Sequence, residues 1–297
     1  MASTIKITID GTRYRIPKDE DIRKAKDFVL QRNETARALA SRIDDILDEM
    51  AEQIVTICYR YDVNPATFTI SSDYNEDMMA EIAEVMDDAE GTIMSLIYEY
   101  STRVTADKDR IALLSAWMAT LGRNNQNLQG TLDGYLYKTM KDYEAAIAAL
   151  RAAGVTMAEA VNLIKLFKHQ IYSMPAILEA FKHNQDFAAQ YIQSLGVQAG
   201  AVGLSNSGAT NVTNMAKTTL QMVWMRSERM DYEADGAVGY YVLRGSNFPC
   251  EKCQDQVGFH PISDVEGFPP RHMNCSCFTI PIYPTEENNL PKTTLYQ

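Results

Sequence analysis

Four of the five cysteines in this chain of 297 residues lie between positions 250 and 277. Cys250 and Cys253 form a C-x2-C pair, and after eighteen intervening residues a second group follows, made of His272, Cys275 and Cys277. Two cysteines separated by two residues in a tight turn can place both thiolates on one tetrahedral metal ion, about 2.3 Å from zinc. The spacing therefore predicts a zinc site in this segment.

A tetrahedral zinc site takes four ligands, and this segment offers five. They are Cys250, Cys253, His272, Cys275 and Cys277. We expect the first two to bind the metal together with two of the last three, and the sequence leaves open which two. The fifth group would orient a ligand through a hydrogen bond. His260, which precedes Pro261, is an outside candidate.

The cysteines could instead form disulfides, stay free or act as a redox pair. Residues 1–10 lack the basic region and apolar run of a secretory signal, so we expect an intracellular protein with reduced or metal-bound cysteines. A redox pair would need a helix directly after a strand, and residues 254–258 have a poor helix sequence. We prefer the metal because it also explains the later cysteines.

The predicted zinc site is structural and not catalytic. A catalytic zinc would keep one position open for water and would need a nearby general base. The acidic residues of the segment have no recognisable catalytic spacing; they are Glu251, Asp255, Asp264 and Glu266. We therefore expect a closed zinc site that staples a segment too short to fold by hydrophobic burial alone. On this interpretation the protein is not an enzyme.

The composition restricts the classes of partner. With 28 basic and 39 acidic residues, the chain carries a formal charge of -11, which repels nucleic-acid backbones. Direct sequence-specific or nonspecific binding of nucleic acid is therefore not expected. No apolar run approaches the roughly 20 residues needed to cross a bilayer, so we expect no membrane association. An apolar content of 46% is sufficient for a sizeable core.

The first 195 residues are predicted to be mainly helical after a short hairpin. Alternating residues from Ile5 to Ile16 around Asp10-Gly11 predict a β-hairpin, which would have to dock on a helical body or on a partner. Residues 19–61 contain no glycine or proline and predict one long helix, or two with a break near Arg32-Asn33. Further helices are expected over 73–103, 107–121, 127–153, 157–172 (after a capping box of Thr156 and Glu159) and 175–195.

A glycine-rich stretch at 196–208 fits no phosphate-binding pattern and is interpreted as a connector or a closely packed segment. A helix over 211–235 and strands over 240–244 and 278–283 follow, so the Cys/His segment lies between two strands. The predicted fold is mainly α, with a long-helix body and N-terminal hairpin at 1–195, a connector at 196–210, a small α+β zinc-stapled unit at 211–284 and a tail at 285–297.

Other residues with reactive side chains are given structural roles. Cys58 lies on the apolar face of a predicted helix, where a free cysteine packs as a small hydrophobe. His169 and His183 have no cysteine or carboxylate at ligand spacing and are assigned no function. An acidic run resembles no calcium loop and predicts a solvated helix face; it consists of Glu84, Asp87, Asp88 and Glu90.

The C-terminal motif resembles that of phage minor head proteins of the Mu F-like head-morphogenesis family. The C-x2-C pair is followed by Val257-Gly258 and then by the run Pro-Pro-Arg-His-Met-Asn-Cys-Ser-Cys at 269–277. Met273 stands where the family usually has proline, and Ser276 where it has arginine. The resemblance covers about residues 205–284, including the order of helix, strand and cysteine pair. Five residues match the motif positions, namely Cys250, Cys253, His272, Cys275 and Cys277.

The resemblance implies a virion structural protein present in a few copies. Such a protein associates with the portal and capsid proteins, lies in the host cytoplasm during assembly and then in the virion, and assists head assembly or genome delivery. Two other functions remain open at this point. One is a zinc-dependent hydrolase or nuclease, and the other is a cytoplasmic adaptor with a structural zinc tip.

Overall fold

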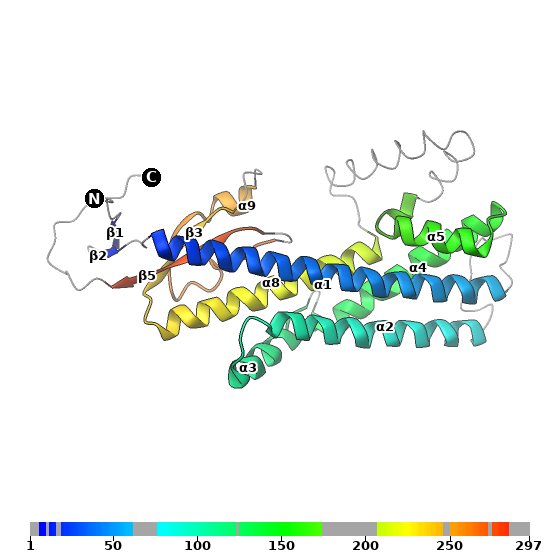
Figure 1. Cartoon of the computed structure of the whole chain (residues 1–297), viewed down its shortest axis with the longest axis horizontal. Coiled ribbons are helices and arrows are strands. Elements are labelled where there is room, and N and C mark those ends of the chain that lie inside the picture. Colours follow the sequence, from blue (N-terminus) through cyan, green and yellow to red (C-terminus); the bar gives the residue numbers. More distant parts are fainter. Residues whose placement is uncertain are drawn as a thin grey trace. The chain divides into compact units, whose positions relative to one another are not determined.

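The computed structural model describes residues 6–9, 12–15, 19–61, 76–122, 125–173, 207–245, 250–272 and 275–284, and all structural statements below concern these residues. The protein is mainly helical and has short strands near both ends of the chain (Figure 1). It divides into two compact units. Unit 1 comprises Met1–Ala38, Glu99–Met118 and Lys217–Gln297, and unit 2 comprises Leu39–Tyr98 and Ala119–Ala216.

The helices are α1 (Asp19–Arg60), α2 (Glu76–Thr102), α3 (Lys108–Ala119), α4 (Leu128–Ala152), α5 (Met157–Phe167), the 3-10 helix η1 (Lys168–Ser173), α8 (Gly208–Ala234) and α9 (Glu251–Gln254). The strands are β1 (Lys6–Ile9), β2 (Thr12–Arg15), β3 (Gly239–Leu243), β4 (Gly258–Pro261) and β5 (Phe278–Pro284). None of these helices combines the length and hydropathy that a bilayer crossing requires.

The predicted long helix is confirmed as the single helix α1, without a break at Arg32-Asn33. The capping box that starts α5 is also confirmed, with Thr156 accepting a hydrogen bond from the Glu159 amide and the Glu159 carboxylate accepting one from the Thr156 amide. The predicted segment 175–195 and most of the glycine-rich stretch lie outside the described residues. The predicted segments are continuous in sequence, whereas each compact unit combines separate parts of the chain.

The core of unit 2 is formed by the apolar faces of its helices. Fully buried side chains come from α1, α2 and α4 and include Leu39, Ile43, Leu47, Ile54, Ile82, Ile93, Leu132, Tyr143 and Ile147. Arg151 of α4 donates hydrogen bonds to the carbonyl oxygens of Cys58 and Tyr61, both at 2.6 Å, and so binds carbonyls that the end of α1 leaves free. The prediction for Cys58 is confirmed: it is fully buried, and burial raises its thiol pKa to about 12.

The predicted connector is wrong at its last three residues, because α8 already begins at Gly208. The Ser207 hydroxyl accepts a hydrogen bond from the Thr210 amide at 3.2 Å, and the Gly208 amide donates to Asp142 at 2.7 Å. These contacts cap the helix end. Gly208 also approaches α4 so closely that an added Cβ would lie 2.2 Å from the backbone nitrogen of Thr139.

Two glycine substitutions should therefore have opposite effects. Gly208→Ala should lower the free energy of unfolding by about 1–3 kcal/mol or more, because the new methyl group overlaps the backbone of α4. Gly91→Ala makes the same chemical change within α2, where an added Cβ meets nothing within 4 Å, and should raise it by about 0.5–1 kcal/mol. Urea unfolding of both variants tests this. Equal effects would contradict the close packing of Gly208.

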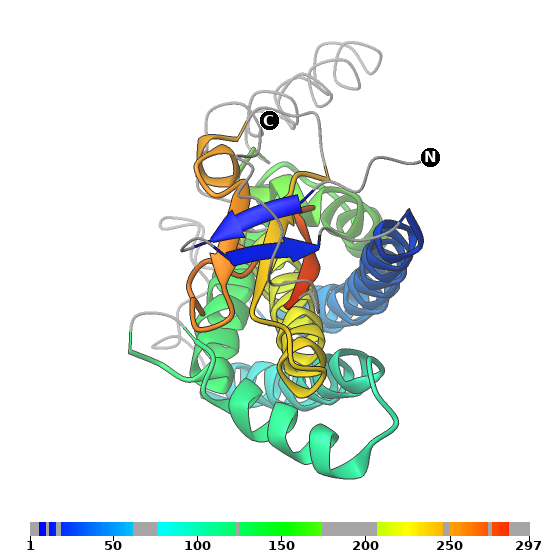
Figure 2. The same cartoon turned by 90° about the vertical axis from the view of Figure 1, so that its left-hand side faces the viewer.

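The strands form one antiparallel sheet in the order β1-β2-β5-β3-β4, which belongs to unit 1. Strand β3 is central: Tyr241 pairs with Ile280 of β5 on one side and with Phe259 of β4 on the other. The predicted hairpin is confirmed as β1-β2 (Figure 2), and it joins the sheet because β2 pairs with β5. Strand β4 was not predicted.

The helices of unit 1 meet at Trp224 of α8, whose side chain is 1% exposed. Its ring centroid lies 5.7 Å from that of Phe28 in α1, and its indole N–H donates to the carbonyl oxygen of Tyr100 in α2 at 3.4 Å. Phe28 also packs against the core that contains Cys253, Cys275 and Cys277. The helical part of unit 1 is thus continuous with the core around the Cys/His segment.

Candidate metal centre

The structure brings all five predicted ligands into one cluster in unit 1. Their donor atoms form two groups in which all atoms lie within 4.8 Å of one another: Cys250, Cys253 and His272 in the first, and Cys253, Cys275 and Cys277 in the second. The Cys253 sulfur belongs to both groups. It lies 2.9 Å from Nε2 of His272 and 3.9 Å from the sulfur of Cys275.

Tight backbone turns position both halves of the cluster. Cys250 has an extended backbone and caps the single turn α9, so that the amides of Cys253 and Gln254 donate to its carbonyl oxygen at 3.2 and 2.9 Å. The Cys275 amide donates to the carbonyl oxygen of His272 at 3.2 Å. A Cβ at Gly245, just after β3, would lie 1.9 Å from the carbonyl oxygen of Ser276. Glycine at position 245 therefore lets the chain that leads to Cys250 and Cys253 approach the chain that carries Cys275 and Cys277.

The spacing suits a tetrahedral ion. Zinc–sulfur bonds of about 2.3 Å place two coordinated sulfurs about 3.8 Å apart, close to the 3.9 Å between Cys253 and Cys275. The same distance is nearly twice a disulfide bond of about 2.05 Å, and all five cysteines of the chain are free. The donor set of thiols and an imidazole suits soft or borderline cations such as zinc better than magnesium or calcium.

The centre is closed on its inner side. Cys275 is fully buried, and Cys253 and Cys277 are 4% and 3% exposed. They share a core with apolar side chains that include Met225, Tyr240, Val242 and Phe268. Cys250 and His272 are half-buried, and Cys250 borders a groove of about 570 Å³ that Glu251 also lines.

The crowded thiols hold their protons unequally. A hydrogen bond from the Cys277 thiol lowers the pKa of Cys275 to about 5, against the opposing effect of burial. The same contact raises the pKa of Cys277, and burial raises that of Cys253 to about 11. The Cys277 thiol thus keeps the proton that it donates to Cys275, and a bound cation would displace that proton. Metal binding should release protons, so the affinity should fall as the pH falls.

His260 is not part of the cluster. One of its ring nitrogens contacts the Asp264 carboxylate at 2.8 Å, and the other contacts the carbonyl oxygen of Gln256 at 2.9 Å. Its ring also stacks on Tyr240, with centroids 5.3 Å apart. These contacts fix the position of the His260 ring beside β4.

His169 also has structural contacts, which lie within unit 2. Its ring contacts the Thr210 hydroxyl at 3.1 Å and the Asp44 carboxylate at 3.2 Å. His183 lies outside the described residues.

Sequence reasoning missed two buried charged residues beside the cluster, Arg32 of α1 and Glu228 of α8. Arg32 is fully buried and donates to the Met225 sulfur at 2.8 Å and to the carbonyl oxygen of Cys275 at 3.3 Å. The signal was present in the helical register, because Arg32 continues the stripe of Val29 and Ala36. The sequence predicts a possible helix break at Arg32-Asn33, whereas the structure places Arg32 in the core of a continuous helix.

Glu228 is buried among polar groups of three elements. Its carboxylate accepts a hydrogen bond from the Thr279 hydroxyl of β5 at 2.9 Å and interacts with Tyr232 of its own helix. Burial raises its pKa to about 7, an effect that Asp231 increases and that Thr279, Tyr232 and Arg32 oppose. The folded protein therefore holds a proton that the unfolded chain releases near pH 4.5.

This raised pKa predicts that Glu228 makes the folded state less stable as the pH rises from about 4.5 to 7. The loss should amount to about 3 kcal/mol across that window. Glu228→Gln keeps an acceptor for Thr279 and should remove this part of the pH dependence. Urea unfolding of both proteins from pH 5 to 8 tests it, because all other titrating groups are common to the two. Parallel stability curves would contradict the raised pKa.

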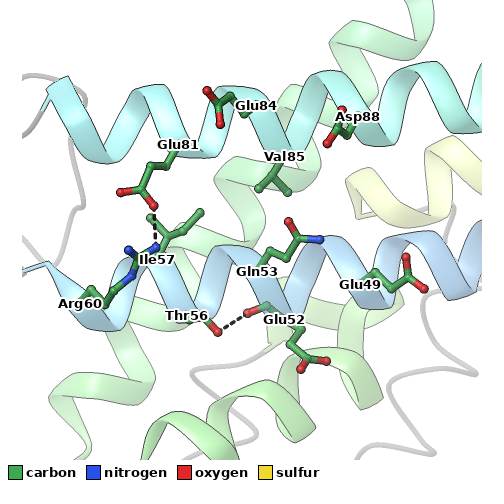
Figure 3. A pocket seen from close by; sticks show the side chains of 10 residues that line it. All are labelled: Glu49, Glu52, Gln53, Thr56, Ile57, Arg60, Glu81, Glu84, Val85 and Asp88. Carbon is green, nitrogen blue, oxygen red and sulfur yellow. Dashed lines mark hydrogen bonds and ion pairs between the residues drawn. The ribbon is translucent and has the colours of Figure 1, made fainter.

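A second groove, of about 610 Å³, lies between α1 and α2 in unit 2 (Figure 3). Its lining is rich in carboxylates and contains no histidine or cysteine; it consists of Glu49, Glu52, Gln53, Thr56, Ile57, Arg60, Glu81, Glu84, Val85 and Asp88. Arg60 pairs with Glu81 at 2.5 Å, and Lys165 pairs with Glu52 at 2.5 Å. The predicted solvated face is confirmed for the acidic run of α2, except that Glu90 is half-buried.

Fold and site together define a mainly helical protein with a small antiparallel sheet and a Cys/His cluster that could hold a metal ion. No family model matches the chain, and neither a curated protein nor a solved structure is significantly similar to it.

Proposed function

We propose that this protein is a phage minor head protein whose Cys/His cluster binds one structural zinc ion. The observation that carries the proposal is the cluster itself, because its members are the five residues that match the Mu F-like motif. The order of α8, β3 and the cysteine pair agrees with the order expected for that family. The partners proposed are the portal and capsid proteins, and the location is the virion.

A structural role for the metal is supported by the small amount of regular structure in this segment. Between β3 and β5 the described elements are one turn of helix, α9, and the four-residue strand β4. Such short elements gain little from burial or from helix propagation. A metal bound by the cysteines at α9 and by those just before β5 would hold these two elements together. Its binding free energy would then contribute directly to the stability of the folded state.

Co-expression tests the virion role. The full-length protein would be produced with the portal and major capsid proteins encoded in the same genome, and assembled heads would be isolated by sedimentation. We expect to find the protein in the heads at a few copies per portal. When it is produced with the portal protein alone, we expect the two proteins to form a complex. If it stays in the soluble fraction with both partners present, or if its gene has no portal or terminase gene nearby, the proposal fails and a cytoplasmic adaptor is favoured.

One observation keeps a zinc-dependent hydrolase as the second candidate. The groove at Cys250 has the Glu251 carboxylate in its lining, and a general base beside a metal is what hydrolysis requires. This candidate requires that the metal keep a water ligand on the Cys250 side. Zinc-loaded protein and its Glu251→Gln variant would be compared on ester, phosphodiester and peptide substrates. Zinc-dependent turnover that the variant loses would favour the enzyme over the head protein.

A further inference from the structure

Arg32 lies in an unusual position for an arginine. Its side chain is fully buried in the core of unit 1, and Arg32 lies more than two hundred residues before Cys250 in the sequence. Its donors are directed to the sulfur of Met225, the side-chain oxygen of Asn33 and the carbonyl oxygen of Cys275. None of these three acceptors carries a charge.

A buried cation is costly unless an anion lies nearby. No carboxylate in the described part of the chain forms an ion pair with Arg32. The anionic groups that act on its guanidinium are Glu228, Cys275 and Cys277, and burial lowers its pKa despite them. Burial raises the pKa of Glu228 to about 7, so its carboxyl carries only part of a negative charge at neutral pH. The remaining source of negative charge is the Cys/His cluster.

Ligand choice sets the charge of the centre. A divalent cation bound by two thiolates and neutral groups leaves no excess charge, whereas three thiolates leave one negative charge and four leave two. Only the last two sets supply the anion that a buried guanidinium requires. The structure holds three thiols within 4.8 Å of one another, those of Cys253, Cys275 and Cys277, and the guanidinium of Arg32 donates to the carbonyl oxygen of Cys275.

We propose that Arg32 is the buried counter-cation of an anionic metal centre with at least three thiolate ligands, and that Cys275 and Cys277 are both among them. This inference rests on the proposed metal site. It narrows the choice left open by the sequence: Cys253, Cys275 and Cys277 bind the metal, and Cys250 or His272 supplies the fourth ligand. Arg32 is a positioning residue, since its contact with the Cys275 carbonyl oxygen also ties α1 to the ligand segment.

The test uses the full-length protein and three arginine variants. Arg32→Met removes the charge and keeps an unbranched apolar chain, whereas Arg32→Lys keeps the charge. Arg229→Met is the matched control, because Arg229 is a second buried arginine of unit 1 that donates to the carbonyl oxygen of Ile262 at 2.8 Å and pairs with Glu233. Zinc affinity is measured by competition with a chromophoric chelator, and cobalt and cadmium titrations report the number of thiolates through their charge-transfer bands.

We expect wild type to show bands for three or four thiolates. Arg32→Met should bind zinc about 10- to 100-fold more weakly, in the range seen when a group supporting a metal ligand is removed, and should release it at a higher pH. Arg32→Lys and Arg229→Met should stay within a few-fold of wild type. Circular dichroism shows whether Arg32→Met is folded. If it is not, the zinc affinity of Arg32→Lys and the number of thiolates in wild type test the proposal instead.

Two results separate the inference from the proposed function. If wild type binds zinc but shows only two thiolates, or if folded Arg32→Met binds as tightly as wild type, the role of Arg32 is wrong and the metal site stands. If reduced wild type binds neither zinc, cobalt nor cadmium, both the metal site and the role of Arg32 are wrong.

Discussion

Cys253→Ser should abolish metal binding, whereas Cys250→Ser should only weaken it. The Cys253 sulfur is the one atom common to both groups of potential ligands, and its side chain is 4% exposed. Its loss leaves only two donors in each group, Cys250 with His272 and Cys275 with Cys277, and no atom that the two groups share. Elemental analysis should show a fall from about one ion per chain to nearly none.

The stability of unit 1 should fall with the metal. A ligand present at 1,000-fold above its dissociation constant stabilises the folded state by about 4 kcal/mol, and Cys253→Ser would lose that amount. Thermal unfolding with added zinc measures the loss. Cys58→Ala is the control, since it also removes one buried thiol but belongs to unit 2 and to neither group of potential ligands. Equal zinc content in the Cys253 and Cys58 variants would contradict the assigned ligands.

Trp224→Ala should have the second largest effect, lowering the free energy of unfolding by about 3–5 kcal/mol. The indole is almost fully buried, contacts Phe28 and donates to the carbonyl oxygen of Tyr100. Its removal leaves a large cavity where parts of three helices of unit 1 meet. Urea unfolding followed by circular dichroism measures the change.

Trp117→Ala is the matched control for this variant. Trp117, the second of the two tryptophans in the chain, is half-buried on α3 and lies beneath the Arg226 guanidinium, with 5.6 Å between the guanidinium carbon and the ring centroid. Its removal should cost markedly less because less apolar area leaves the core. A cost equal to that of Trp224→Ala would show that Trp224 is not the central contact of these helices.

Local sequence signals predicted most of the elements. The absence of glycine and proline over residues 19–61 predicted α1, and the capping box at Thr156 and Glu159 predicted the start of α5. Alternation on both sides of Asp10-Gly11 predicted β1 and β2. These signals are local because a helix or hairpin is determined largely by residues within a few positions of one another.

The elements that were missed depend on distant contacts. Strand β4 has only four residues and forms because β3 offers it a free edge, with Tyr240 opposite His260. The early start of α8 depends on Asp142 of another helix, which accepts from the Gly208 amide. Neither contact can be derived from residues near the element itself.

The candidate site was predicted in its members but not in its surroundings. The cysteine spacing identified the five groups that the fold brings together, because ligand spacing in a turn is a local property. Arg32 lies 243 positions from Cys275, and only the tertiary structure places its guanidinium against that residue's carbonyl oxygen. Unit 1 combines three separate parts of the chain. A division of the sequence into consecutive domains therefore does not predict such contacts.

Native mass spectrometry of the full-length protein tests the central claim most directly. The protein would be purified under reducing conditions, without a metal-affinity step and without added metal. We predict a single species whose mass exceeds that of the chain by one zinc ion. Acidification should displace the metal, and the mass should then equal that of the bare chain. A bare chain from the outset, in protein that is reduced and folded, would contradict the account.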